Sequence, residues 1–132
     1  MNDTYITYGL VDRLMEDAVK SPRLRCSLNI HASLEEACQR IVNVLLPVSI
    51  VPVHRHRATD ETIVVLCGKM DVVLYGETGG VSSRHRLDPR EGRYGLNIPK
   101  GQWHTVEVLE PTAIFEVKDG PYCPLEPEDI MY

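Results

Sequence analysis

Short runs of β-branched residues, separated by turn residues, fill the chain from residue 48 onward, with no helical pattern between them. Two loops, at 68–69 and 77–80, are predicted to be hairpin turns, and prolines and glycines separate the other runs. Many short strands at even spacing indicate a sandwich or barrel and argue against a βαβ fold. We expect strands near residues 50–56, 61–67, 70–75, 83–88, 94–98, 104–109 and 113–118.

The residues before this region show a different pattern. Apolar side chains recur at helical spacing over residues 9–20, and Pro22 prevents the helix from continuing. Residues 24–31 then alternate strictly between apolar and polar side chains, with Leu24 and Cys26 on one face and Arg25 on the other. This alternation predicts a strand with one buried face.

A second helix is predicted directly after this strand. Ser33 and Glu36 have the spacing of a capping box, in which each side chain satisfies a free backbone N–H, and Pro47 would end the helix. The chain has the length of one domain. We therefore expect a single domain over residues 1–132, made of an N-terminal extension and a barrel at about residues 1–46 and 47–120.

The charge pattern limits the partners of the chain. A net charge of −5 argues against nucleic acid, which needs a basic surface. Basic residues are nevertheless concentrated between positions 20 and 57, where there are only two acids. This segment is either a solvated face or an arginine-rich rim that recruits a small anion. Its basic residues are Lys20, Arg23, Arg25, Arg40, Arg55 and Arg57.

The sequence also limits where the protein works. Its four cysteines are widely spaced, and the N-terminal letters MNDTYITYGL lack the basic and apolar regions of a secretory signal. We therefore expect reduced thiols and a cytoplasmic protein. The most apolar stretch, residues 41–53, is shorter than the about 20 apolar residues of a membrane span, so no membrane association is predicted.

The pattern with the clearest chemistry is His54-Arg55-His56 on a predicted strand. Side chains at positions i and i+2 share one face, so both imidazoles point the same way and Arg55 points the other way. Glu61 begins the next predicted strand and could lie beside them, and His104 could supply a fourth ligand from a distant strand. Imidazoles with a carboxylate suit iron, manganese, nickel, cobalt or zinc.

This spacing is similar to the two sequence motifs of the cupins. His54, His56, Glu61 and Gly68 match the first motif, and Pro99, Gly101 and His104 match the core of the second. The resemblance implies an all-β fold, a small cupin (double-stranded β-helix or jelly-roll) barrel, here with two N-terminal helices. It also implies one divalent transition metal held by His54, His56, Glu61 and His104. Val48 and Val108 depart from the motifs, at positions that are not ligands.

A closer resemblance covers nearly the whole chain. Residues 21–31 (SPRLRCSLNIH), the pair Gln39-Arg40, residues 51–56 (VPVHRH) and residues 114–122 (IFEVKDGPY) resemble the WbuC-type cupins, some of which are encoded in bacterial O-antigen gene clusters. The reaction of that family is not settled. The resemblance implies a context of surface polysaccharide metabolism, and it implies substrate-binding roles for Arg23, Arg25, Asn29, His31, Gln39 and Arg40.

We favour a metalloenzyme that acts on a small anionic or sugar-type ligand. The metal would act through an open coordination position, arginines would hold a phosphate or carboxylate, and His31 and Tyr122 are candidate proton carriers. One alternative is an Fe(II)-dependent dioxygenase, which would need two open neighbouring positions on the metal. Another is a non-catalytic binding or sensor cupin, because a fold does not fix a function. The N-terminal strand could also pair with a second copy to form a homodimer.

Overall fold

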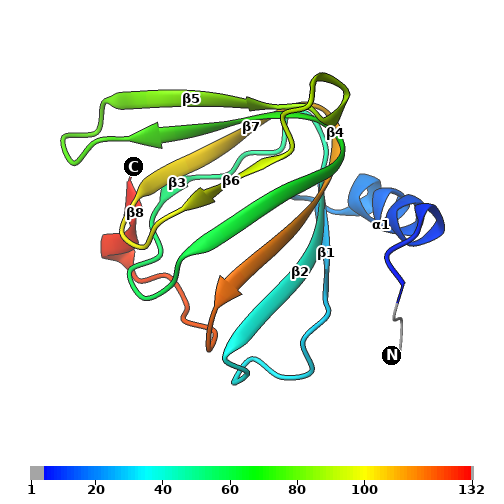
Figure 1. The fold of residues 1–132 in the computed structure, drawn as a ribbon, viewed down its shortest axis with the longest axis horizontal. Coiled ribbons are helices and arrows are strands. Elements are labelled where there is room, and N and C mark those ends of the chain that lie inside the picture. The colour runs from blue at the N-terminus through cyan, green and yellow to red at the C-terminus, as the bar shows by residue number, and fades with distance from the viewer. Residues whose placement is uncertain (1–4, 132) are drawn as a thin grey trace.

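The computed structural model describes residues 5–131, in which one helix precedes a barrel of antiparallel strands (Figure 1). All eight strands found in these residues belong to one sheet. Helix α1 spans Tyr8–Lys20, and two 3-10 helices, η1 and η2, span Pro89–Glu91 and Pro127–Asp129. The strands are β1 (Arg25–Asn29), β2 (Cys38–Leu45), β3 (Val53–His54), β4 (Glu61–Tyr75), β5 (Val81–Leu87), β6 (Gly95–Ile98), β7 (Trp103–Asp119) and β8 (Ile130–Met131).

The two longest strands, β4 and β7, form the frame of the barrel. Each combines two strands that the sequence pattern predicts separately, and they pair with each other over most of their length. Their register shifts on both sides of Gly68, which has φ of 99°. A Cβ at Gly68 would lie 2.3 Å from the carbonyl oxygen of Pro111. The hairpin predicted at residues 68–69 is therefore wrong, because the chain bends there as a bulge and continues in the same strand.

The first predicted helix is present as α1. The hydroxyl oxygen of Thr7 caps its start by accepting a hydrogen bond from the backbone N–H of Leu10 at 3.2 Å. Ser21 is its C-cap, directly before Pro22, as the rule for residues preceding proline predicts. The helix lies outside the barrel, against β1 and β2 (Figure 1).

The second predicted helix is wrong, so the fold has one N-terminal α-helix among the described residues. Residues 38–45 form strand β2, and the residues before them form a turn. In a helix, the backbone carbonyls of these residues would accept hydrogen bonds from N–H groups four residues later. Here two of them accept hydrogen bonds from residues far along the chain. That of Leu34 accepts from the N–H of Tyr122 at 2.8 Å, and that of Ala37 accepts from the N–H of Gly120 at 2.7 Å. The residues that follow β7 thereby hold this turn in place.

Strand β2 separates two apolar clusters. On its outer face Val42 and Val44 pack against the buried side of α1. On its inner face Leu45 joins the barrel core with Ile63 and Ile114. Both faces of β2 are therefore covered, and the strand is apolar on both.

The described residues contain no helix with the length and hydropathy needed to cross a lipid bilayer. All four cysteines are free thiols.

Candidate metal centre

Three histidines meet at one end of the barrel, where β3 lies between β7 and β8. The pairing of β3 with β7 places His54 opposite His104, and His56 follows two residues later. Ring nitrogens of the three side chains lie within 4.8 Å of one another. The ring centroids of His54 and His104 are 4.4 Å apart. The fold thus brings together three of the four residues predicted to be ligands.

Backbone carbonyls fix the orientation of two of these rings. His54 Nδ1 lies 2.8 Å from the carbonyl oxygen of Pro52, and His104 Nδ1 lies 2.9 Å from that of Gln102. Since a carbonyl oxygen can only accept, each Nδ1 carries the hydrogen, and each neutral ring keeps a free lone pair on Nε2. Burial, with the nearby His104, lowers the pKa of His54 to about 4, and burial also lowers the pKa of His104. Both rings are therefore neutral at pH 7, as metal ligands must be.

Glu61, the fourth predicted ligand, begins β4 and is buried beside the histidines. Its Oε2 lies 3.2 Å from His56 Nε2 and 3.8 Å from Lys118 Nζ. Burial raises the pKa of Glu61, but contact with His56 and the charge of Lys118 outweigh it and bring the pKa to about 2. Despite the short contact with His56, this oxygen accepts no hydrogen bond of good geometry from the described residues. A buried ionised oxygen without such a bond, beside a cluster of imidazoles, fits a divalent metal.

Two further charged residues line the same cavity, which has a volume of about 180 Å³. Glu116 Oε1 accepts a hydrogen bond from Asn43 Nδ2 at 3.0 Å, and Glu116 Oε2 lies 4.0 Å from Lys118 Nζ. Burial and the charge of Glu61 raise the pKa of Glu116, which favours its protonated form. The sequence pattern did not predict these two residues. Their spacing of two on a strand, E-V-K, was the available signal that both side chains share one face.

The polar face of β1 lies beside this cavity. Arg25 pairs with Leu45 on the inner face of β2, and Arg25 lines the metal cavity together with Asn43. A more polar groove of about 290 Å³ shares these two residues and also includes Arg23. By strand alternation Asn29 lies on the same face of β1 as Arg25.

The other predicted substrate-binding residues lie in different places. Gln39 is on the inner face of β2, whereas Arg40 is on the outer face, 3.8 Å from Glu36. His31 is buried beside β2, where its Nδ1 accepts a hydrogen bond from the N–H of Arg40 at 3.0 Å. His31 is therefore not among the residues that line the metal cavity.

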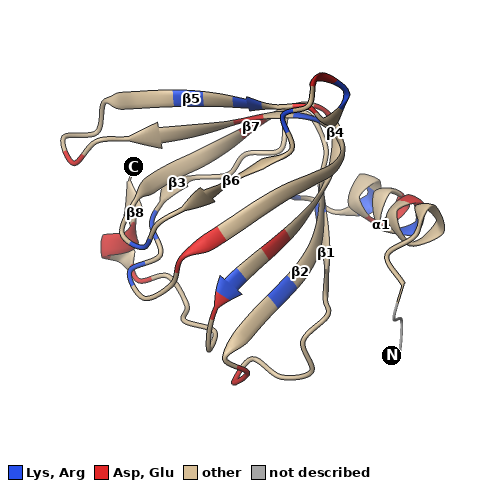
Figure 2. Ribbon diagram, in the orientation of Figure 1, with Lys and Arg blue, Asp and Glu red and all other residues tan. Residues whose placement is uncertain are grey.

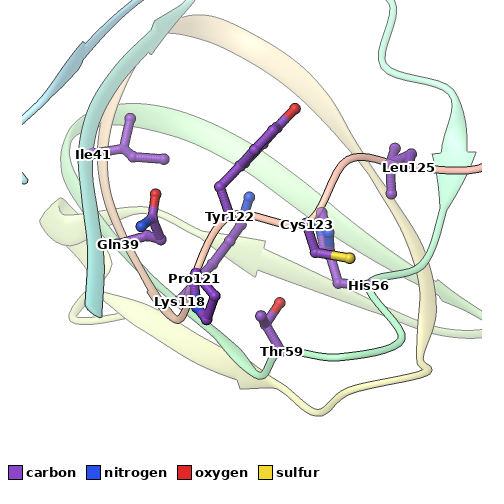
Figure 3. Close-up of a pocket in the computed structure, with 9 residues that line it drawn as sticks. All are labelled: Gln39, Ile41, His56, Thr59, Lys118, Pro121, Tyr122, Cys123 and Leu125. Carbon is purple, nitrogen blue, oxygen red and sulfur yellow. The ribbon is translucent and has the colours of Figure 1, made fainter. Parts of the chain in front are cut away.

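A second cavity, of about 220 Å³, adjoins the metal cavity and shares His56 and Lys118 with it. Figure 3 shows Gln39 on β2 at one side of it, His56 at the other side, and Tyr122 between them. Figure 2 shows that acidic and basic residues occupy neighbouring ends of β4 and β7 in this part of the barrel. The second cavity therefore extends the charged metal cavity into a region with fewer charged side chains.

Arg55 points away from the histidines, as alternation predicts. Its guanidinium carbon lies 4.7 Å from the centroid of the Trp103 ring, and its Nε lies 3.2 Å from Asp129 Oδ1. Asp129 in η2 also pairs with Arg57 at 2.6 Å, and its carbonyl accepts from the backbone N–H of Arg55 at 3.0 Å. Through these contacts Asp129 binds the C-terminal segment to Arg55 and Arg57, which follow β3.

We expect Asp129→Asn to lower metal affinity about tenfold, the lower end of the range for residues that support metal ligands, because β3 would be held less firmly. Asp71 offers a matched control, since it is also buried (2% exposed against 5%) and pairs with Arg84 and Arg86 on β5. Calorimetric zinc titration and thermal unfolding should show that Asp71→Asn loses stability without losing zinc affinity. Equal zinc affinities in the two variants would contradict the role of Asp129.

The family model described as "Domain of unknown function (DUF6016)" matches residues 6–87, a range that runs from the start of α1 to the end of β5. No curated protein matches the chain.

Solved structures show the same fold at low identity. KdgF from Halomonas sp. is 17% identical with a TM-score of 0.59, over 74% of this chain and 81% of that one. The Cnp3 cupin domain of Schizosaccharomyces pombe is 12% identical with a TM-score of 0.59, over 72% and 64%. Oxalate decarboxylase of Bacillus subtilis, described for its Mn(II) centres, is 17% identical with a TM-score of 0.57, over 76% of this chain but only 26% of that longer one. The barrel is therefore a cupin fold.

Proposed function

The chain belongs to the DUF6016 family, and we propose that it is a cupin that binds one divalent transition metal through His54, His56, Glu61 and His104. The observation that carries this proposal is the cluster of three imidazoles, one of which, that of His56, contacts the buried carboxylate of Glu61. Two of these rings have their Nδ1 atoms bonded to backbone carbonyls, which leaves the other nitrogen free to bind a metal. The donor set suits iron, manganese, nickel, cobalt or zinc.

We further propose that the protein is an enzyme acting on a small anionic ligand. When bound, the metal supplies a Lewis acid that polarises an oxygen of the substrate. Arg25 and Lys118 line the same cavity and attract an anion, and the carboxyl group of Glu116 holds a proton there. Tyr122 lines the adjoining cavity and is a second proton carrier.

Two alternative functions use the same centre. An Fe(II)-dependent dioxygenase would contain iron and consume oxygen, whereas a non-catalytic binding or sensor protein would bind the ligand without changing it. The resemblance to O-antigen cluster cupins supports a role in bacterial surface polysaccharide metabolism. The four free cysteines support a location in the cytoplasm. Identification of the metal and turnover assays distinguish these functions.

The direct test is elemental analysis of protein purified without added metal. We expect about one equivalent of iron, manganese, nickel, cobalt or zinc per chain, and restoration to one equivalent after chelation and titration. Protein that takes up none of these metals in titration would contradict the proposed function.

The proposed anion contact predicts that Arg25→Ala weakens binding of glycolate to cobalt-loaded protein by about 1–3 kcal/mol, the range for hydrogen bonds to charged groups. Isothermal titration calorimetry would measure this loss. The exposed Arg93, next to η1, provides the control variant Arg93→Ala. Unchanged glycolate affinity in Arg25→Ala would show that the anion is held elsewhere.

A further inference from the structure

The inner face of β2 forms one wall shared by two cavities. Asn43 and Leu45 line the metal cavity, whereas Gln39 and Ile41 line the cavity in Figure 3. The two cavities also share His56 and Lys118. Four alternate positions of one strand span about 20 Å, so the two cavities form a trough with room for a ligand longer than the metal cavity alone would hold.

The two ends of this trough have different chemistry. The metal end carries Arg25, Lys118 and the proposed divalent cation against the two carboxylates of Glu61 and Glu116, so positive charge is in excess there. That end favours an anionic oxygen donor. Apart from the shared Lys118, the far end has no formal charge of its own, and Ile41, Pro121 and Leu125 form part of its wall.

The polar side chains at the far end of the trough are placed to form hydrogen bonds with uncharged groups of a ligand. Gln39 is buried, and its Nε2 donates to the carbonyls of Glu36 at 2.9 Å and Leu34 at 3.3 Å. Its Oε1 receives no hydrogen bond from any residue that the structure describes, so it is free to accept one from a ligand. Thr59 adds a buried hydroxyl, and Tyr122 adds a phenol at the exposed side.

We propose that this cavity is the subsite for the hydroxylated chain of a polyhydroxy carboxylate whose carboxylate end lies in the metal cavity. This inference rests on the proposed function. An apolar chain would leave Gln39 Oε1 without a donor, and a second anionic group would face that oxygen and the carbonyl-rich turn at residues 34–37. A chain of hydroxyl groups can donate to Gln39 and exchange hydrogen bonds with Thr59 and Tyr122.

Three probes with the same α-hydroxycarboxylate head test the subsite. Glycolate has no chain, 2-hydroxyhexanoate has an apolar chain, and gluconate has a hydroxylated chain. Each is titrated calorimetrically into cobalt-loaded protein. We expect gluconate to bind at least tenfold more tightly than the other two, and a crystal structure of its complex to show the chain beside Gln39.

Variants separate the contribution of the far cavity from that of the metal. Tyr122→Phe and Gln39→Leu should each reduce the advantage of gluconate over glycolate at least threefold. Tyr94→Phe is the control, because Tyr94 is as exposed as Tyr122 (59% against 55%) and lies outside the cavity. Because Gln39→Leu also removes two internal hydrogen bonds, Tyr122→Phe provides the test that does not depend on folding.

The outcomes are distinguishable. Glycolate and gluconate affinities within twofold of each other, or equal binding of 2-hydroxyhexanoate and gluconate, would overturn the subsite while leaving the metal centre intact. Failure to take up cobalt would instead overturn the proposed function, and the subsite with it.

Discussion

Replacing His104 with alanine is expected to lower metal affinity at least a hundredfold, since losing a residue that merely supports a ligand already costs about 10- to 100-fold. His104 is 2% exposed and lies on the long strand β7, opposite His54 on β3. Its Nδ1 donates to the Gln102 carbonyl, which orients the ring and leaves Nε2 free to bind the metal. Competition with a chromophoric chelator would measure zinc affinity for the variant and the wild type.

The control for this experiment is His85→Ala, which removes an exposed histidine of β5. Circular dichroism should show that both variants keep the β-rich fold in the absence of metal. A His104→Ala protein that binds zinc within threefold of the wild type would rule out His104 as a ligand, and with it the proposed four-residue centre.

The position of the histidines could be predicted because strand alternation is a local rule. His54 and His56 share a face for any strand that contains them, and Pro99 and Gly101 match a known motif around His104. Their meeting depends on the pairing of β3 with β7, which residue spacing alone does not specify. The resemblance to cupins supplied that long-range information.

The error at residues 33–45 has an identifiable cause. The capping contact exists, because the carboxylate of Glu36 accepts from the backbone N–H of Ser33 at 3.3 Å, but it closes a turn and no helix follows. The next residues cover both the barrel core and α1, so apolar side chains occur on both faces of β2. A strand of this kind lacks period-two alternation and can imitate a helix in sequence.

Glu116 and Lys118 show a different limit. Both lie on β7, but their importance comes from residues on other strands: Glu61 lies 3.8 Å from Lys118, and Asn43 donates a hydrogen bond to Glu116. A lysine and a glutamate at alternate positions are ordinary on a solvent-facing strand. The face of β7 that carries Glu116 and Lys118 points inward only because the sheet closes into a barrel. The role of these two residues therefore follows from tertiary structure.

Acidification is expected to destabilise the metal-free protein between about pH 6.5 and pH 4, before most carboxylates are protonated. Burial and the neighbouring His104 lower the pKa of His54 to about 4 in the folded state, whereas an exposed imidazole has its usual value near 6.5. The unfolded chain therefore binds a proton in this interval that the folded chain does not. Stability falls as the pH falls, by up to about 3 kcal/mol from this residue, and the loss levels off below pH 4.

Glu61 also makes the stability fall as the pH falls, but in a lower pH interval than His54. Its pKa is about 2 in the folded state, below the usual value of 4.5, so the stability that it contributes is present above pH 4.5 and is lost as the pH falls toward 2. The histidine and carboxylate effects can thus be separated by pH. Urea unfolding of chelator-treated protein at intervals from pH 7.5 to 3.5 would resolve the first of them.

The variant His54→Gln keeps a polar side chain but removes the titrating ring, so its stability should fall much less than that of the wild type between pH 6.5 and 4. His85→Gln controls for the loss of one imidazole from an exposed strand. Bound metal would compete with protons for the same nitrogens, so zinc-loaded wild type should resist acid until the metal dissociates. A wild-type pH dependence in His54→Gln would mean that His54 is not the source of the acid sensitivity.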